Sequence, residues 1–560
     1  MKITQYFSFF SIALPVVLVT LYFWVFVCYA VNAPQLDDYM DLLVVMPDYV
    51  EAAGLRQKWH ILFQQYHEHR YLTGHLLSAL FVEIFGVLDF RFLMGAGNLA
   101  LLGFAVLLVR EFSGAGYRAV MMPVTALLLF NLQAQGSMFW ATAAWAHYAL
   151  LFFSMAAFTL IAAEKALHRY IPAFGFCALA VFTQANGLFV AVLVVFFCLF
   201  EFFDKESHKA WPLLVFWLCA ASLMGAAYFH DFDTSQRVGE THLSVPDQVR
   251  AIVEHPLNVL MGFLLFLGGV FVDMDDRENV LALLFGCFSG AMVVSAFCWL
   301  VLCYKTRKLY PLKMLMLLIF ASAASVACLR ASVMGVDQAL QGHYKIYSLI
   351  SVLFVFFVAL LWAERHSART RLLCNVLACL MAAGVYGVSC ATNLPGVEQK
   401  RTAIVDDFNY WLERNNLKRA SVRFFVPQYN RKLNRAVSVG VYSPEVLLLP
   451  SRQVAVFQSV DACPQGLVVA EGLALSYKPG AWGVAVRGEI PFDVDRDEGQ
   501  EVWLCAGKTV FYLALAERNL QWSEGARGRV SVDVLVPRAL FPKHLRPERI
   551  ELMIRGSYEK

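Results

Sequence analysis

The sequence predicts a polytopic α-helical membrane protein of about 11 transmembrane helices with interfacial helices, followed by a β-rich soluble domain. Hydrophobic residues make up 59% of the 560 positions and charged residues only 16%, against about a quarter in an ordinary soluble domain. Apolar runs of about 20 residues, long enough to cross a bilayer, recur through residues 1–391. Residues 392–560 have the mixed composition of a soluble protein. We therefore expect a membrane domain over 1–391 and a soluble domain over 392–560.

The first apolar run, residues 8–30, follows Lys2. It is too long for the core of a signal peptide and no small-residue cleavage site follows it, so we expect an uncleaved first span. Two shorter stretches, 71–88 and 257–272, are interrupted by polar residues or glycines, and we expect them to lie along the membrane surface. The other expected spans are 91–110, 119–133, 139–163, 170–184, 187–203, 211–229, 280–303, 313–329, 343–363 and 372–391.

The basic loops set the expected orientation. With both ambiguous stretches outside the membrane, the loops rich in Lys and Arg all fall on one side, as the positive-inside rule requires. The N-terminus is then cytoplasmic, and the segment 31–90, the loop 230–279 and the C-terminal tail lie on the opposite face. In a bacterium this face is the periplasm, so the expected location is the bacterial inner membrane.

The two expected spans 170–184 and 187–203 are short and meet at a polar segment that contains Gln184 and Asn186. A polar tip at membrane depth is tolerated where it lines a cavity. These two side chains are therefore candidate cavity residues, and a plain tight turn between helices is the alternative.

The tail is expected to be β-rich, because its β-branched and aromatic segments are separated by Gly, Pro and Asp turns. A helix over 406–416 is expected to link it to the membrane domain. The expected strands cover 421–426, 453–460, 466–476, 482–487, 501–504, 509–515 and 529–536.

The charge balance argues against nucleic acid as a partner, and the cysteine spacing argues against a structural zinc site. The net charge is only +3, so no basic excess indicates nucleic acid. The chain has no CxxC motif and no Cys/His cluster, so a structural zinc site is not expected. Cys463 and Cys505 are the only cysteines of the tail, and they could form a disulfide if the tail lies outside the cytoplasm.

Two adjacent carboxylates, Asp37 and Asp38, lie within a few residues of the end of the first span. Charge at this position is costly unless it is used or solvated. On a helix, adjacent side chains point about 100° apart, so one could face a cavity while the other holds a partner. The alternative is an interfacial loop with two hydrated carboxylates.

Four ionisable residues in a row, His67, Glu68, His69 and Arg70, precede the stretch 71–88. They do not form the zinc motif HExxH, because His69 follows Glu68 directly. A polar cap on a surface helix accounts for Glu68, which is favourable near a helix N-terminus, but it accounts less well for Arg70.

A third external cluster joins Arg330 and Lys345, which lie at opposite ends of one short loop that also contains His343 and Tyr344. Two cations held at the membrane surface suit a lipid-linked phosphate or diphosphate. The commoner use of such residues is to reach phospholipid headgroups.

Taken together, these parts resemble the GT-C superfamily of integral membrane glycosyltransferases, which use polyprenyl-phosphate-linked sugars as donors. The resemblance covers the membrane domain and rests on the order of its parts: a span, the Asp37-Asp38 loop, an interfacial helix, a short helix pair and a C-terminal domain. It is greatest for bacterial envelope members, which carry an Asp-Asp loop, a Glu-His-Arg segment and a basic-Tyr-x-x-Tyr-Ser segment, here His343-Tyr344-Lys345-Ile346-Tyr347-Ser348.

The resemblance implies a role for each motif. Asp37 is expected to be the base, Asp38 to orient the acceptor or a metal ion, and Glu68 to assist. The expected ligands of the donor phosphate are Arg70, Arg330, His343 and Lys345. The expected acceptor and cavity residues are His67, His69, Gln184, Asn186 and Tyr344. No cofactor is certain, and a divalent ion (Mg or Mn) held by Asp37 and Asp38 is left open because only some members use one.

The implied activity is inverting transfer of a sugar from a polyprenyl-phosphate donor to an envelope glycan, lipid or protein. An O-antigen polymerase or ligase is an alternative, although such proteins usually lack a sizeable β-rich tail. A flippase or transporter of lipid-linked sugar is another. It would be expected to have matching halves and ionisable residues in the middle of its spans, and the sequence has neither.

Overall fold

The computed structural model describes residues 2–66, 69–114, 117–163, 167–203, 211–233, 245–272, 278–414, 417 and 426–444, with further strands between 468 and 555. For the strands and for residues 2–10, 114, 167–169, 245, 409, 410, 412–414, 426 and 427, only the backbone is described. The chain divides into two compact units. One comprises Met1–Gln399 and Ala436–Tyr442, and the other comprises Lys400–Arg435 and Ser443–Lys560.

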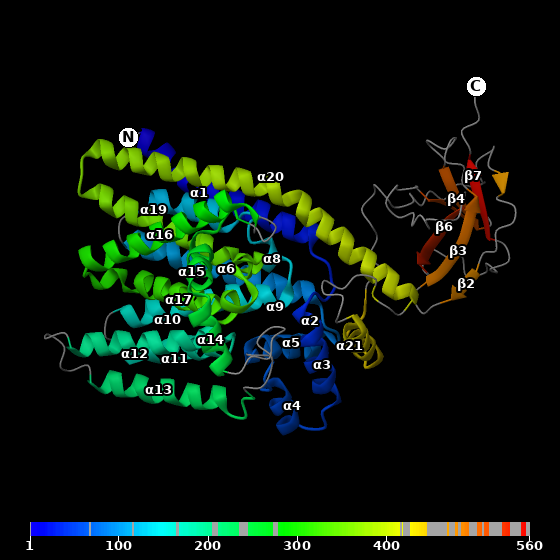
Figure 1. The fold of residues 1–560 in the computed structure, drawn as a ribbon, viewed down its shortest axis with the longest axis horizontal. Helices are drawn as coiled ribbons and strands as arrows, with labels where there is room; N and C mark the ends of the chain where they lie inside the picture. The colour runs from blue at the N-terminus through cyan, green and yellow to red at the C-terminus, as the bar shows by residue number, and fades with distance from the viewer. Residues whose placement is uncertain are drawn as a thin grey trace. The chain divides into compact units, whose positions relative to one another are not determined.

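The described part of the first unit is built from helices (Figure 1). Its first half contains α1 (Lys2–Tyr29), α2 (Asp37–Met40), α3 (Leu42–Glu51), α4 (Leu55–Leu62), α5 (Leu72–Phe85), α6 (Phe90–Gly114), α7 (Arg118–Leu129), α8 (Gln135–Met138), α9 (Ala141–Ala143), the π-helical turn η1 (Ala144–Ala149), α10 (Leu150–Ala162), α11 (Leu167–Val181), the 3₁₀ turn η2 (Ala185–Gly187) and α12 (Leu188–Phe203).

Its second half contains a bent helix pair and the last long helices. The elements are α13 (Trp211–Phe229), α14 (Val245–Glu254), α15 (Pro256–Gly268), α16 (Val280–Cys303), η5 (Arg307–Leu309), α17 (Tyr310–Val326), the π-helical turn η6 (Ala327–Ala331), α18 (Ser332–Met334), η7 (Val336–Leu340), η8 (Gly342–Tyr344), α19 (Lys345–Glu364) and α20 (Ala368–Arg414), which continues into the second unit.

Several of these helices make the chain a multi-pass membrane protein. Among the described residues, nine helical segments are long and apolar enough to cross a membrane: Ser11–Tyr29, Phe90–Ser113, Ala141–Ala162, Ala185–Phe203, Trp211–Phe229, Val280–Cys303, Arg307–Met334, Gly342–Glu364 and Ala368–Phe408. A tenth span is possible if the pair Pro246–Glu254 and Pro256–Gly268, bent by 87°, counts as one.

Eleven spans were predicted, and by length and composition the described residues contain nine candidates, without the runs 119–133 and 170–184. The run 119–133 forms a helix of 12 residues and the run 170–184 one of 15, both shorter than a bilayer requires. The first of them ends early because the Asn131 amide turns back and donates to the Leu127 carbonyl at 3.1 Å. This contact satisfies a carbonyl that a longer helix would have bonded internally.

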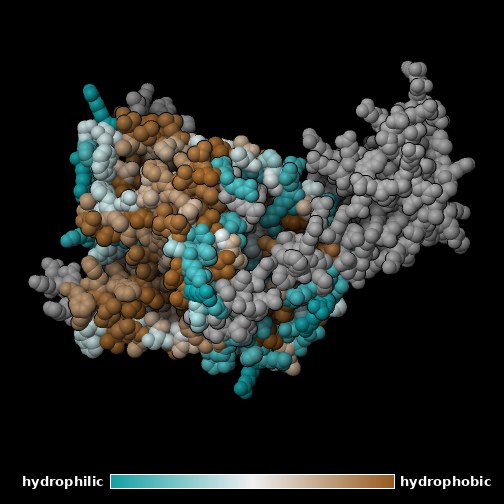
Figure 2. All heavy atoms as spheres, in the orientation of Figure 1, coloured by the Kyte–Doolittle hydropathy of each residue, from teal (hydrophilic) through white to brown (hydrophobic). Residues whose placement is uncertain are grey.

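Burial separates inner from outer helices. The segments Ala141–Ala162 and Gly342–Glu364 are mostly buried in the bundle, whereas Ser11–Tyr29, Trp211–Phe229 and Val280–Cys303 expose most of their apolar residues. Figure 2 shows apolar residues over the sides of the long helices and hydrophilic groups toward their ends. An exposed apolar flank of this extent fits a lipid environment.

The short helices α2, α3, α4 and α5 gather at one end of the long helices (Figure 1). α5 is the predicted surface stretch 71–88, and its 14 residues do not reach the length of a span. These four helices all belong to the segment between the first two spans, so this segment forms a folded cap on the bundle.

The last predicted span and residues 406–414 of the predicted linking helix form one continuous helix, α20, of 47 residues, which continues through Pro395. Within the first unit, α20 is held by side-chain amides. Asn393 Nδ2 donates to Gln133 Oε1 at 3.0 Å, and Gln135 Nε2 donates to Asn393 Oδ1 at 3.1 Å.

In the second unit, the end of α20 contacts α21 (Val426–Ser438), where Trp411 Nε1 donates to Asn434 Oδ1 at 3.1 Å. Two antiparallel sheets have the strand orders β1-β7-β4-β5 and β2-β3-β6. The strands are β1 (Val468–Val469), β2 (Ser476–Pro479), β3 (Gly483–Pro491), β4 (Glu501–Ala506), β5 (Thr509–Leu513), β6 (Arg529–Pro537) and β7 (Ile550–Arg555).

The predictions for the tail have mixed outcomes. Val426, the end of the expected strand 421–426, begins a helix, and the expected strand 453–460 lies outside the described residues. A soluble β-rich domain stays a prediction. The pairing of Cys463 with Cys505 also stays a prediction, because Cys463 lies outside the described residues.

Candidate functional site

The acidic turn, residues 36–41, follows the first span and contains three carboxylates. The Asp41 amide closes it by donating to the Asp37 carbonyl at 2.8 Å. Leu36, at its start, has a φ of 42°, in the left-handed region that residues other than glycine rarely adopt. Strain of this kind costs about 1–3 kcal/mol and persists only where the surrounding structure enforces it.

Asp38 is completely buried, and its carboxylate is held by three donors. The Thr142 amide donates to Oδ1 at 2.9 Å and the Thr142 hydroxyl donates to the same oxygen. The Gln35 amide donates to Oδ2 at 2.9 Å. Because Thr142 begins a long buried helical segment and Gln35 lies on the loop before α2, the carboxylate fixes the acidic turn to the bundle.

Burial raises the pKa of Asp38 to about 7, and the neighbouring Asp37 carboxylate adds to the increase. The hydrogen bonds from Thr142 and Gln35 act in the opposite direction, because they stabilise the charged form. The ionisation of Asp38 is therefore balanced close to neutral pH, and the loss of one donor would change it.

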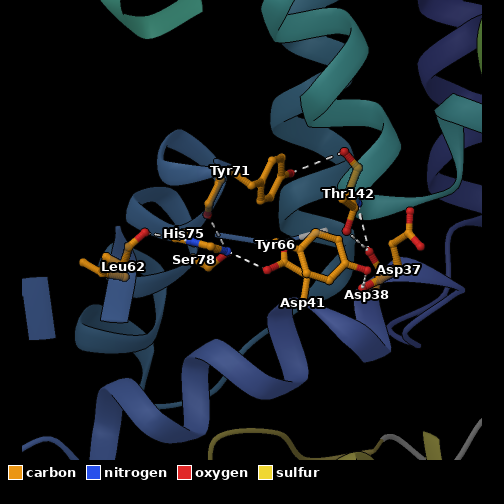
Figure 3. Close-up of polar contacts among 10 residues, drawn as sticks. Asp37, Asp38, Asp41, Leu62, Tyr66, Tyr71, His75, Ser78 and Thr142 are labelled. Atoms are coloured by element: carbon orange, nitrogen blue, oxygen red, sulfur yellow. Dashed lines mark hydrogen bonds and ion pairs between the residues drawn. The ribbon is translucent and has the colours of Figure 1, made fainter. Parts of the chain in front are cut away.

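Asp37 is half-buried, in contrast to Asp38. Its carbonyl accepts a hydrogen bond from the Tyr66 hydroxyl at 3.4 Å. In Figure 3 its side chain points away from Tyr66 and from the Asp41–His75 contact. The two adjacent carboxylates thus have different surroundings, as the helical spacing predicts.

Asp41, the last residue of the acidic turn, forms a buried pair with His75 of α5 (Figure 3). His75 Nε2 is 2.6 Å from Asp41 Oδ1, and His75 Nδ1 is 2.8 Å from the Leu62 carbonyl. Burial lowers the pKa of His75, but the Asp41 carboxylate and the two hydrogen bonds outweigh this effect, so the net pKa lies above the ordinary value. Sequence reasoning missed this pair. The one feature of the local sequence that could have indicated the pair is a histidine inside an otherwise apolar helix.

The segment before α5 forms a tight reversal. The amides of Tyr66 and His69 each donate to the other's carbonyl at 2.8 Å. His67 and Glu68 lie outside the described residues, so their expected roles stay predictions.

Arg70 is buried, and its guanidinium donates to three backbone carbonyls, those of Phe63, Tyr228 and His230. It also lies over the Phe63 ring, 4.8 Å from the centroid. These contacts join α4 to the end of α13. Arg70 therefore positions two segments at this end of the bundle, and its expected contact with a donor phosphate stays a prediction.

The third predicted motif forms a packed cluster. Arg330 donates to the Tyr344 hydroxyl at 3.0 Å, and the Tyr344 ring centroid lies 4.1 Å from that of His343. Lys345 is buried, and its ammonium donates to the carbonyls of Gly269, at 2.8 Å, and Val272. A cation at these carbonyls, just after α15, also interacts favourably with the negative end of the helix dipole.

Two further residues, Trp140 and His147, belong to this cluster and were not predicted. The His147 ring stacks on His343, with centroids 5.1 Å apart, and the Trp140 ring meets His343 edge-on at 5.5 Å. His147 Nδ1 is 3.1 Å from the Tyr347 hydroxyl. No local signal marks Trp140 or His147, because both occur in an apolar run that is typical of a buried span. We call Trp140, His147, His343 and Tyr344 the aromatic cluster.

His147 connects two of the predicted motifs, because it interacts electrostatically with both His69 and Arg330. The acidic turn is joined to the same region through one short segment, 139–142. Asp38 binds Thr142 at one end of this segment, and Trp140 contacts His343. The structure thus brings the three sequence motifs to one end of the bundle.

The segment with Gln184 and Asn186 forms a close turn between α11 and α12. A Cβ atom on Gly187 would lie 1.9 Å from the Ala180 carbonyl oxygen, so only glycine fits there. Thr183 Oγ1 is 2.8 Å from Thr73 Oγ1 on α5. A tight turn is therefore observed, packed beside the start of α5, and the role of Gln184 and Asn186 in a cavity stays a prediction.

The described residues contain no complete metal site at the acidic turn, and a divalent ion held by Asp37 and Asp38 stays a prediction. Among those residues, no three His, Cys, Asp or Glu side chains are placed to hold an ion. Both oxygens of Asp38 already accept hydrogen bonds from amide or hydroxyl groups. A carboxylate has about four lone-pair sites, so these hydrogen bonds alone do not prevent Asp38 from binding a cation.

No family model and no curated protein matches the chain. Among solved structures, the chain is similar to the Archaeoglobus fulgidus oligosaccharyltransferase in complex with Zn and sulfate, with 15% sequence identity and a TM-score of 0.34. The match covers 66% of this chain and 53% of that one, so the chain spans about half the length of that protein. A TM-score this low does not establish a shared fold.

Proposed function

We propose that the protein is a membrane glycosyltransferase that moves a sugar from a polyprenyl-phosphate-linked donor to an envelope glycan, lipid or protein. The observation that carries this proposal is the acidic turn. A buried carboxylate, Asp38, is fixed by three donors beside a more exposed one, Asp37, at one end of the apolar helices. A fixed acidic pair of this kind suits a base for transfer from a lipid phosphate, and the resemblance of the motifs to GT-C enzymes supports the proposal.

Asp37 is the proposed base. Its carboxylate accepts the proton of the acceptor hydroxyl while that oxygen forms a bond to the anomeric carbon of the donor. The bond from the anomeric carbon to the phosphate oxygen breaks, and the electron pair leaves with the lipid phosphate, which inverts the configuration. Asp38 has a positioning role, because its three hydrogen bonds hold the turn on which Asp37 lies. Glu68, with His67 and His69, is proposed to assist.

Arg330 is the proposed main ligand of the leaving phosphate. Its contact with Tyr344 places it beside the aromatic cluster, and charge-assisted hydrogen bonds to phosphate strengthen as negative charge develops on the leaving group. His343 lies next to it and is proposed to contribute. Arg70 and Lys345 bind backbone carbonyls around the same end of the bundle, so we propose that they shape the donor site chiefly by holding its walls.

We further propose that this end of the bundle faces the periplasm of a bacterium, with the N-terminus in the cytoplasm. The distribution of Lys and Arg among the loops supports this orientation. Lipid-linked donor and acceptor would then meet outside the inner membrane.

The test is transfer by the purified protein in detergent, supplied with a panel of radiolabelled polyprenyl-phosphate sugars and an envelope extract, with and without EDTA. We expect label in a glycan, lipid or protein, and the samples with EDTA will show whether transfer needs a divalent ion. No transfer from any donor would refute the proposal. Movement of labelled lipid across vesicles that contain the protein would then favour a flippase, and growth of a preassembled lipid-linked glycan would favour a polymerase or ligase.

A further inference from the structure

We infer that the buried pair of Asp41 and His75 is a positioning clamp that holds the acidic turn in its strained conformation. The inference rests on the proposed function, because it assigns this pair a task in sugar transfer. Neither residue is part of the predicted motifs. The pair acts through the backbone of the turn, and the roles of base and phosphate ligand stay with the residues named above.

The pair is isolated from solvent and has few partners. Both side chains are completely buried, and their ring nitrogen and carboxylate oxygen are 2.6 Å apart. Within the described residues, Asp41 Oδ2 accepts no hydrogen bond, so His75 is the donor on which this carboxylate depends. Removal of one partner leaves an uncompensated buried charge and strongly destabilises the folded state. The contact between Asp41 and His75 is therefore expected to stay closed in the folded protein.

The backbone links this contact to Asp37. The Asp41 amide donates to the Asp37 carbonyl at 2.8 Å, and the Asp41 carbonyl accepts from the Val45 amide at 2.9 Å. Asp41 thus ends α2 and starts α3. Its side chain is tied through His75 to the Leu62 carbonyl on α4, so the clamp fixes the end of the turn while Thr142 and Gln35 fix its middle. The left-handed Leu36 lies at the start and would relax if the turn were released.

The positions of the protons on His75 allow a positioning role of the pair to be distinguished from a role in proton transfer. A carbonyl only accepts, so His75 Nδ1 must carry a proton toward Leu62. With Asn at position 41, the amide Nδ2 donates to a neutral Nε2, and both ring nitrogens remain bonded. With Leu at position 41, Nε2 loses its partner. A positioning clamp therefore tolerates Asp41→Asn and fails with Asp41→Leu, whereas a proton relay fails with both.

The kinetic test compares these two variants in the transfer assay. We expect Asp41→Leu to lower kcat by about 100-fold with the donor KM within about threefold of the wild type, because displacement of a catalytic group affects the chemical step. Asp41→Asn should keep kcat within about threefold. The matched control is Lys58→Gln, which removes the exposed ion pair of Lys58 with Glu83 in the same cap and should leave kcat unchanged. A wild-type kcat for Asp41→Leu, or equal losses for both variants, would overturn the inference.

A second measurement does not need activity. Arg56 is exposed on α4, the helix that the clamp holds, so its cleavage by trypsin reports opening of the cap. We expect Asp41→Leu to be cleaved after Arg56 at least about tenfold faster than the wild type and Asp41→Asn at the wild-type rate. Equal rates for all three proteins would overturn the clamp itself. If the wild type transfers no sugar, the proposed function fails while the cleavage rates still decide whether the clamp exists.

Discussion

Thr142→Val removes one of the three donors that hold the Asp38 carboxylate and leaves the side-chain volume almost unchanged. The Thr142 hydroxyl donates to Asp38 Oδ1, while its amide donates to the same atom and is retained in the variant. The lost hydrogen bond lowered the pKa of Asp38 against the effect of burial, which raises it to about 7. The substitution therefore raises the pKa of Asp38 further.

The size of the shift follows from the energy of the lost bond. A hydrogen bond to a charged group contributes about 1.5–3 kcal/mol, and one pKa unit corresponds to about 1.4 kcal/mol. The pKa of Asp38 should then rise by about one to two units. Asp38 is ionised above its pKa, so at pH 7 the ionised fraction falls from about a half to a tenth or less, and a higher pH restores it.

The assay is the initial rate of transfer between pH 6 and pH 10. If an ionised Asp38 is required, the wild-type rate should rise with a midpoint near pH 7, and that of Thr142→Val should rise about one to two units higher. The matched control is Thr125→Val, because the Thr125 hydroxyl is buried with no hydrogen-bond partner among the described residues. An unshifted midpoint for Thr142→Val, or the same shift in the control, would refute the reasoning.

Two further predictions test the donor site and the close turn. Arg330→Gln should raise the KM for the donor at least about tenfold, because it removes a charge-assisted hydrogen bond worth about 1.5–3 kcal/mol. The measurement is steady-state kinetics over a range of donor concentrations, and an unchanged KM would contradict the prediction. Gly187→Ala should lower the melting temperature of the purified protein by several degrees, because the added Cβ meets the Ala180 carbonyl. The control Gly175→Ala, with nothing within 4 Å of the added Cβ, should leave the melting temperature unchanged. Equal melting temperatures for the two variants would refute the prediction.

Much of the fold follows from composition, since long apolar runs have few alternatives to a membrane helix. The run 343–363 is α19 almost to the residue. The shortness of α7 was not predictable, because it depends on the Asn131 side chain turning back on the helix, and asparagine at the end of an apolar run also occurs in loops between full spans. The continuation of α20 through Pro395 was missed for the opposite reason, because proline usually ends a helix.

The candidate site was predictable only where ionisable residues stand out against apolar neighbours. Asp37, Asp38 and Arg330 are prominent for that reason. Thr142 was not predictable, because its contact with Asp38 joins positions 104 residues apart. His75 gave only the weak signal of one histidine in an apolar helix, and its partner Asp41 is one of several acids in the same loop. Tertiary contacts that assign different roles to similar side chains leave no trace in the local sequence.

The central claim is that the acidic turn supplies the base for sugar transfer, and Asp37→Asn tests it most directly. The variant keeps the size of the side chain and removes its ability to accept the proton. In single-turnover transfer from the active donor, we predict a loss of at least about 100-fold relative to the wild type. Asp48→Asn, a change of the same kind on α3, should retain the wild-type rate. Wild-type transfer by Asp37→Asn would contradict the account, and loss of transfer in Asp38→Asn alone would exchange the two roles.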